Sequence, residues 1–282
     1  MKKSIIASAV VAVAFGLAAC TEEAKAADAT VYGYIEQSVS TSADAMDISD
    51  DNNVGIKVSE SLNEAGDTAF AKVEFGVDDE TNAITNRETY VGVTVNNITA
   101  QVGRQKNLRK SMANGVDAFY GESFSVAGAS RVDDTVVVKG EFAGVTLAGS
   151  TVLDGTANAD EVAETHEVGA ALDLNGVNLT VVASKVGDDA YTKTFAAGVE
   201  VAGLDLVVAH EPDAANATTT GVASVDLGSN TLRGGYAYVD GADNTMIAEV
   251  AHNFSKSTAA FVNYSKAENA DANTTIGLAM AF

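Results

Sequence analysis

The residues best placed to act on another molecule are charged side chains at alternate positions of strand-like segments. In residues 54–59, Lys57 lies on the face opposite three apolar side chains, and in residues 70–75 Lys72 and Glu74 share a face while apolar residues fill the other. A row of charges on one face of a strand faces water and creates an electric field along that face. The same alternation assigns five further charged residues to this polar face: Glu36, Glu88, Glu200, Arg233 and Glu249.

Signals for catalysis, metal binding or a cofactor are few. His166, His210 and His252 lie far apart without metal-ligand spacing, and no nucleophile elbow or phosphate-binding glycine loop is present. The acidic segment from Ser42 to Asn52 lacks the glycine and terminal glutamate of a helix-loop-helix calcium site, and we expect a solvated loop there. We therefore expect no enzyme, no cofactor and no metal. A site on a strand wall built from His210 or His252 with a nearby Ser or Asp is the alternative.

Residues 1–26 have the layout of a secretory signal peptide. Lys2 and Lys3 precede an apolar stretch that is too short for a spanning helix, and Ala24-Lys25-Ala26 forms a small-residue cleavage site. A second interpretation stays open, because Leu17-Ala18-Ala19-Cys20 resembles a lipoprotein box. Cys20, the chain's only cysteine, is then either removed or lipidated, and neither outcome allows a disulfide within the chain.

The composition excludes several classes of protein. The formal net charge of −22 makes nucleic acid an unlikely partner. Apolar residues make up 46% of the chain but aromatic residues only 6%, and tryptophan is absent, so large side chains for a dense soluble core are scarce. The apolar residues alternate with polar ones instead of forming helical stripes. This pattern favours an all-β protein.

The segments that alternate form a regular meander. Tight turns such as Asn96-Asn97 and Asn175-Gly176 alternate with longer polar loops. This alternation is typical of a membrane barrel, in which successive connections lie on opposite sides of the membrane. We expect about sixteen strands, at residues 29–39, 53–60, 68–77, 87–95, 98–104, 131–139, 142–152, 166–174, 177–184, 192–201, 204–210, 220–226, 231–239, 245–253, 258–265 and 273–282.

The last ten residues are the clearest strand in the sequence. Ile276, Leu278, Met280 and Phe282 share one parity, and small or polar residues fill the other. A terminal strand with an apolar face and a final aromatic residue is typical of the closing strand of a transmembrane antiparallel up-and-down β-barrel. Phe282 is then the expected membrane-assembly signal. A soluble β-sandwich also alternates, but at this length it would rarely bury so little aromatic mass.

Five motifs in order resemble those of Gram-negative general porins: Val31–Glu36 (VYGYIE), Val54–Phe75, Asn86–Val93 (NRETYVGV), Val102–Gln105 (VGRQ) and Arg131–Val136 (RVDDTV). Each motif alone is weak evidence for this family. The resemblance rests on the occurrence of all five in the family's order, together with the terminal Phe. Tyr34 departs from the pattern, which often has a basic residue there. The resemblance implies a sixteen-stranded barrel over residues 27–282, usually a homotrimer, whose third external loop folds into the pore and constricts it.

The resemblance places this constriction loop at about residues 106–129. It also implies loop carboxylates opposite basic residues of the wall, with Arg104 of the VGRQ motif as the wall candidate. Strict alternation aims Arg104 toward lipid with Val102, and Arg87 shares the apolar parity of Val91, so both assignments rest on the resemblance. The expected lining of the pore and constriction is Lys57, Lys72, Arg87, Arg104, Lys106, Arg109, Lys110, Asp117, Glu122 and Arg131.

The function implied is a water-filled outer-membrane channel for passive diffusion of small hydrophilic solutes and ions. Two alternatives stay open. A substrate-selective channel, for example for sugars, would use an aromatic track, and Tyr32, Tyr34, Phe70 and Tyr90 share the polar parity. The other alternative is a non-conducting structural or adhesive barrel. Expected partners are two further copies of the chain, outer-membrane lipid, lipopolysaccharide bridged through divalent cations, and the barrel-assembly machinery of a Gram-negative bacterium.

Overall fold

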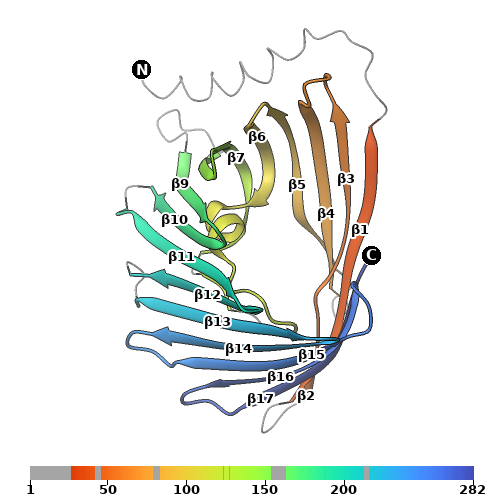
Figure 1. The fold of residues 1–282 in the computed structure, drawn as a ribbon, viewed down its shortest axis with the longest axis vertical. Coiled ribbons are helices and arrows are strands. Elements are labelled where there is room, and N and C mark those ends of the chain that lie inside the picture. The colour runs from red at the N-terminus through yellow and green to blue at the C-terminus, as the bar shows by residue number, and fades with distance from the viewer. Residues whose placement is uncertain are drawn as a thin grey trace.

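A computed structural model describes residues 27–41, 46–78, 83–122, 124–126, 128–153, 163–187, 189–212 and 216–282. The expected signal peptide, with Cys20, lies outside these residues. The described chain is a closed antiparallel β-barrel (Figure 1). Its strands are β1 (Asp28–Thr41), β2 (Met46–Asp50), β3 (Asn52–Ser61), β4 (Thr68–Asp78), β5 (Ala83–Val95), β6 (Ile98–Lys106), β7 (Arg131–Phe142), β8 (Val145–Leu153), β9 (Ala163–Leu174), β10 (Val177–Val186), β11 (Thr192–Val201), β12 (Leu204–Glu211), β13 (Thr218–Leu227), β14 (Asn230–Val239), β15 (Thr245–Asn253), β16 (Thr258–Ala267) and β17 (Asn273–Ala281).

The barrel has sixteen strands, as the sequence predicts, because β2 and β3 together occupy one strand position in the wall. They pair with consecutive parts of β1, residues 37–41 and 28–34, and are separated only by Asp51. The segment Ser42–Asn52 was expected as a loop, and this was wrong for Met46–Asp50, which extend the first hairpin as β2. On its other edge β1 pairs with β17 from Tyr34–Ala281 to Thr41–Thr274, and this pairing closes the barrel.

The connections differ between the two rims. One rim carries two-residue hairpins, in which Ala143-Gly144, Asn175-Gly176 and Ala202-Gly203 all have positive φ at both residues. Positive φ at both positions defines a type I′ turn, whose twist matches that of the strands it joins. The other rim carries the longest connection, residues 107–130 between β6 and β7. The expected alternation of tight turns and longer loops is therefore confirmed for these connections.

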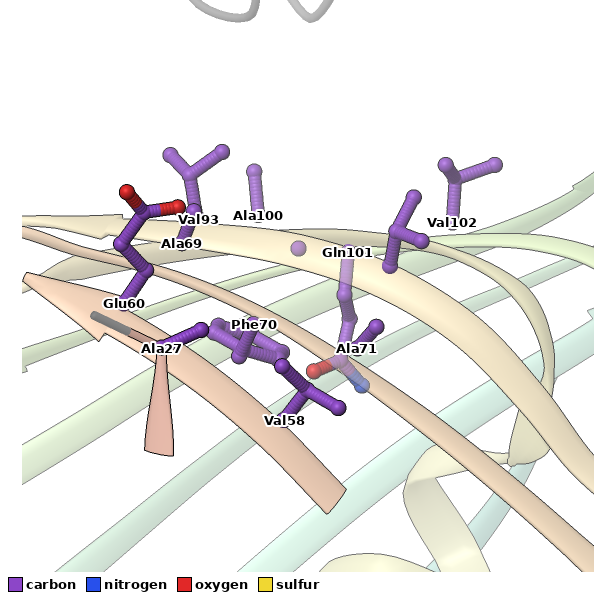
Figure 2. A pocket seen from close by; sticks show the side chains of 12 residues that line it. Ala27, Val58, Glu60, Ala69, Phe70, Ala71, Val93, Ala100, Gln101 and Val102 are labelled. Carbon is purple, nitrogen blue, oxygen red and sulfur yellow. The ribbon is translucent and has the colours of Figure 1, made fainter. Parts of the chain in front are cut away.

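The two faces of the wall differ as the alternation predicts. On β17, Ile276 and Leu278 are 59% and 58% exposed on the outer face, whereas Thr275 on the inner face is 1% exposed. Figure 2 shows the same division near a surface hollow over β3–β6, where Ala100 and Val102 stand on one side of the sheet and Gln101 on the other. An apolar outer band around a polar interior is the arrangement that a bilayer requires of a barrel.

The interior charges follow the same rule. Glu36, Glu88 and Glu249 are buried inside the barrel, and Arg233 pairs with Glu249. Glu200 lies at the end of β11, exposed and opposite Asp205. In the part of the chain that is described, no helix is long and apolar enough to cross a membrane.

Candidate functional site

The segment 107–130 is a loop that folds into the barrel. Glu167 of β9 fixes the first residues of this loop. The Glu167 carboxylate accepts a hydrogen bond from the backbone N–H of Leu108 at 2.6 Å, and Arg109 Nε lies 3.6 Å from its other oxygen. Asn107 closes the base of the loop by donating to the Gly128 carbonyl at 2.7 Å. The single π-helical turn η2 (Arg109–Ala113) follows and lies inside the barrel (Figure 1).

The middle of the loop packs on the inner wall through apolar side chains. Val116, Phe124 and Val126 form a buried cluster with small and apolar residues of β12–β15: Ala209, Val222, Ala237 and Ile247. Gly235 is needed here, because a Cβ at that position would lie 2.8 Å or less from the rings of Phe119 and Phe124. A short aromatic stretch in the loop therefore meets a stretch of wall with small side chains.

The tip of the loop, Tyr120–Glu122, is held by carboxylates of β15 and β1. Glu249 of β15 accepts the N–H of Tyr120 at 2.8 Å, and Glu36 of β1 accepts the N–H of Gly121 at 2.7 Å. The Tyr120 ring stacks on Phe261 with centroids 5.1 Å apart. Glu122 accepts hydrogen bonds from Ser265 and Asn273. The carboxylate of Glu122 thus serves to anchor the loop.

A charged cluster covers the inner face of β3–β7, on the side of the barrel away from the loop's apolar cluster. Lys72 lies 2.9 Å from Glu74 and 2.8 Å from Glu88. Arg131 reaches Glu88 at 3.3 Å, and Arg87 reaches Glu74 at 3.1 Å and Asp51 at 2.5 Å. We call Lys72, Glu74, Arg87, Glu88 and Arg131 the wall cluster. Its members come from three strands, so their proximity depends on the register of β4, β5 and β7.

A β-bulge explains how Arg87 joins the wall cluster despite its parity. In the pairing of β4 with β5, Glu74 faces Glu88 but Phe75 faces Asn86, so Arg87 is the extra residue. An extra residue bends the strand and redirects its side chain. The side chain of Arg87 consequently turns to Glu74, whereas simple alternation would aim it outward.

Arg104 does not join the wall cluster, which corrects the expectation drawn from the resemblance. In the register of β5 and β6, Arg104 faces Thr89, and Val102 faces Val91, which places Arg104 in the outward row. Its guanidinium donates to the Asn86 carbonyl at 2.8 Å and pairs with the exposed Asp133 at 2.7 Å. The bulge between Gly103 and Gln105 leaves Arg104 on the outer side.

The remaining charges of the expected lining lie along the loop and the wall. Lys110 Nζ lies 3.9 Å from the carboxylate of Asp117, which also accepts a hydrogen bond from Asn114. Burial raises the pKa of Asp117, and the nearby Lys110 offsets part of this shift. Lys57 lies over the Tyr32 ring. Positive side chains thus concentrate on one wall, and the loop presents the Lys110–Asp117 pair.

The sequence shows similarity to one protein family along nearly its whole length. The family model described as Gram-negative porin matches residues 7–272. The chain belongs to the Gram-negative porin family. It is an outer-membrane porin channel. A comparison with curated protein sequences finds no match.

Solved structures of other porins share the fold of this porin. A loop-deletion mutant of OmpT from Vibrio cholerae aligns with a TM-score of 0.75 at 13% identity, covering 92% of this chain and 100% of that one. A multiple mutant of the Rhodobacter blasticus porin aligns with a TM-score of 0.72 at 16% identity, covering 90% of this chain and 100% of that one. At these identities the likeness supports the fold alone.

Sequence reasoning did not identify the anchors of the porin's loop. Glu36 and Glu249 were placed inside the barrel by alternation, but their binding to the amides of Gly121 and Tyr120 depends on contacts across 85 and 129 residues. The one available signal was a glutamate on polar parity with no basic neighbour on an adjacent strand, as for Glu36. Glu167 carried the same signal and was not singled out.

The histidines of the porin have simple polar partners. His210 Nδ1 lies 2.9 Å from the Thr219 hydroxyl, and His252 Nδ1 lies 2.9 Å from the Asn230 side chain. Each pair joins neighbouring strands. Membership of the porin family indicates a channel and not an enzyme.

Proposed function

We propose that this porin is a passive diffusion channel for small hydrophilic solutes and ions, with segment 107–130 as its constriction and no enzymatic activity. The observation that carries the proposal is the attachment of the loop at its entrance, middle and tip to the inner wall. A loop held at three places keeps a fixed cross-section, and a fixed cross-section gives a steady conductance.

The proposed lining combines the wall cluster with neighbouring charges. Lys57, Lys72, Arg87, Lys106 and Arg131 belong to the wall, and Arg109, Lys110 and Asp117 belong to the loop. Opposed charges across a narrow lumen create a transverse field that orients dipolar solutes and disfavours apolar ones. Arg104 is left out because of its outward contacts, and Glu122 is assigned to loop anchoring.

We further propose the assembly and partners that are typical of this family. Porin homologues are typically trimeric outer-membrane proteins. On the basis of that membership we propose a homotrimer of this chain and contact with lipopolysaccharide at the loop rim. We also propose delivery by a cleaved signal peptide and insertion by the barrel-assembly machinery. Phe282, on the outward row of the closing seam, is the proposed assembly signal.

Conductance of the purified protein in planar bilayers tests the proposed channel. We expect steady currents that sugars of small size do not reduce in a saturable way. Absence of current would favour the non-conducting structural barrel, and saturable reduction by a sugar would favour a sugar-selective channel.

The role of the loop is tested by releasing its tip. Glu36→Ala combined with Glu249→Ala removes both acceptors of the tip amides, so we expect a larger and noisier single-channel current and passage of larger sugars. The control is Glu60→Ala, which removes a carboxylate from the outward parity of β3. An unchanged current in the double variant would show that segment 107–130 does not set the resistance.

A further inference from the structure

Lys57 differs from the cations of the wall cluster, Lys72, Arg87 and Arg131, in its partners. It lies directly opposite Lys72 in the register of β3 and β4, and like charges in this position repel each other. Lys72 is compensated by Glu74 and Glu88. Among the residues that the structure describes, Lys57 contacts the Tyr32 ring, whose centroid lies 4.7 Å from its Nζ. The Lys57 residue is exposed, and no carboxylate within the described part of the chain forms an ion pair with it.

Aromatic side chains lie next to this ammonium on the same inner wall. Lys72 faces Tyr90 across the β4–β5 pairing, and Phe70 lies one step further along β4 on the same face. Phe70 and Tyr90 meet edge to face with centroids 6.3 Å apart. Phe70 is diagonal to Lys57 in the β3–β4 register, a spacing of about 7 Å.

Glycines allow two of these rings to lie close to the wall. A Cβ at Gly92 would overlap the Phe70 ring, and a Cβ at Gly55 would overlap the Tyr32 ring. The Phe70 ring therefore lies over Gly92 of the neighbouring strand β5, and the Tyr32 ring lies over Gly55 of the neighbouring strand β3. The hydroxyl of Tyr32 donates to Glu74 at 2.8 Å, which fixes that ring beside the two lysines. The result is a patch with a cation at one side and aromatic surface at the other.

We propose that this patch, made of Tyr32, Lys57, Phe70, Lys72 and Tyr90, is a binding subsite for organic anions that carry a flat ring, such as aromatic carboxylates. The carboxylate of the solute would accept hydrogen bonds from the ammonium groups of Lys57 and Lys72. The ring of the solute would lie against Phe70 and Tyr90. The proposal rests on the proposed channel function and names a class of solute for it. A small inorganic anion would use only the lysines, and a neutral sugar would use only the rings, so neither matches the whole patch.

The test measures the reduction of single-channel current by three probes: benzoate, acetate and benzamide. Acetate has the charge without the ring, and benzamide has nearly the shape of benzoate without the charge. We expect saturable reduction by benzoate only. Because one charge-assisted contact is lost, Lys57→Gln should raise the apparent dissociation constant of benzoate roughly tenfold. Phe70→Leu should raise it as well.

The matched control is Lys139→Gln. Lys139 lies near the rim of tight turns and pairs with Glu141 at 2.8 Å, so its loss changes the charge without touching the patch. Benzoate binding that is unchanged in Lys57→Gln, or weakened equally in Lys139→Gln, would overturn the subsite. Equal effects of acetate or of benzamide would overturn it too.

A second measurement does not depend on current. Saturation-transfer NMR of benzoate with the detergent-solubilised protein reports binding directly, and heat-modifiable mobility confirms that each variant is folded. If the wild type carries no current but binds benzoate through Lys57, the proposed channel fails while the subsite stands. If it conducts normally and shows no binding, the subsite fails alone.

Discussion

Glu36, Glu167 and Glu249 hold the inward loop through its backbone amides, and Glu167 also lies 3.6 Å from the side chain of Arg109. A carboxylate that accepts a backbone N–H forms a charge-assisted bond, and an unpaired buried amide costs about 1–3 kcal/mol. Leu108, Tyr120 and Gly121 supply these amides. The side chains at these positions are constrained as well, because Leu108 is buried, Tyr120 stacks on Phe261, and a Cβ at Gly121, whose φ is +63°, would lie 3.0 Å from the Phe261 ring. The path depends on three glutamates that lie in distant strands.

At the scale of single residues, Asp117 should make the selectivity depend on pH. Burial raises its pKa, so the carboxyl takes up a proton at a higher pH than a free aspartate does. As the pH falls through this range, the constriction loses a negative charge and its preference for cations should decrease. The measurement is the reversal potential in a salt gradient from neutral to mildly acidic pH.

Asp117→Asn is the control for this assignment. It should show the reduced cation preference already at neutral pH, with a flatter pH dependence in the mildly acidic range. The raised pKa of Asp117 also makes the stability of the fold depend on pH. Because the folded-state pKa is raised, ionised Asp117 opposes folding, and this cost disappears as the pH falls below the raised value. An Asp117→Asn channel with the pH profile of the wild type would contradict the assignment.

At the scale of elements, the type I′ turns carry avoidable strain. Ala143 and Ala202 have φ of 48° and 53°, a region that costs a non-glycine residue roughly 1–2 kcal/mol. Asn175 occupies the same position in its own turn, and Asn tolerates this region better. Ala202→Asn should therefore stabilise the barrel by about 1 kcal/mol, measured by equilibrium unfolding in detergent or lipid. Gly203→Ala, at φ of 80°, should destabilise it, and equal stabilities of the three proteins would refute the strain.

Local pattern predicts the strands well because a strand in a barrel wall meets two different environments along its whole length. The same rule is insufficient at Arg87 and Arg104. One β-bulge turns Arg87 inward, and another leaves Arg104 outward, and neither bulge has a sequence signature strong enough to locate it. β2 was missed because it is only five residues long, lies within a segment rich in aspartate, and pairs only with the far end of β1. The attachment of the loop depends on contacts between strands distant in sequence, which alternation does not encode.

At the scale of the whole molecule, the contact of Phe282 with Gly33 extends the β1–β17 pairing that closes the barrel. The two residues exchange backbone hydrogen bonds of 3.0 and 3.1 Å, and the Phe282 ring lies where a Cβ of Gly33 would stand. Phe282→Asp places a charge on the outward row of the closing seam, so the yield of heat-modifiable barrel in the outer membrane should fall severely. Phe254→Asp is the control, since Phe254 is exposed in a turn and a charge near the interface costs about 0–1 kcal/mol. Normal assembly of the Phe282→Asp variant would exclude Phe282 as an assembly signal.

The charge of the whole chain should set the ion selectivity, against the local effect of the wall cluster. The formal net charge of −22 concentrates cations near the pore entrances, and salt screens this field beyond roughly 10 Å at 0.1 M. The wall favours anions, but Asp51, Glu74 and Glu88 offset much of its positive charge. We expect a modest cation preference in reversal-potential measurements, which fades as the salt concentration rises. Clear anion selectivity would mean that the wall dominates, and Arg131→Gln should then reduce it because Arg131 extends the basic surface toward the loop. The outward Arg104→Gln should leave the selectivity unchanged in either case.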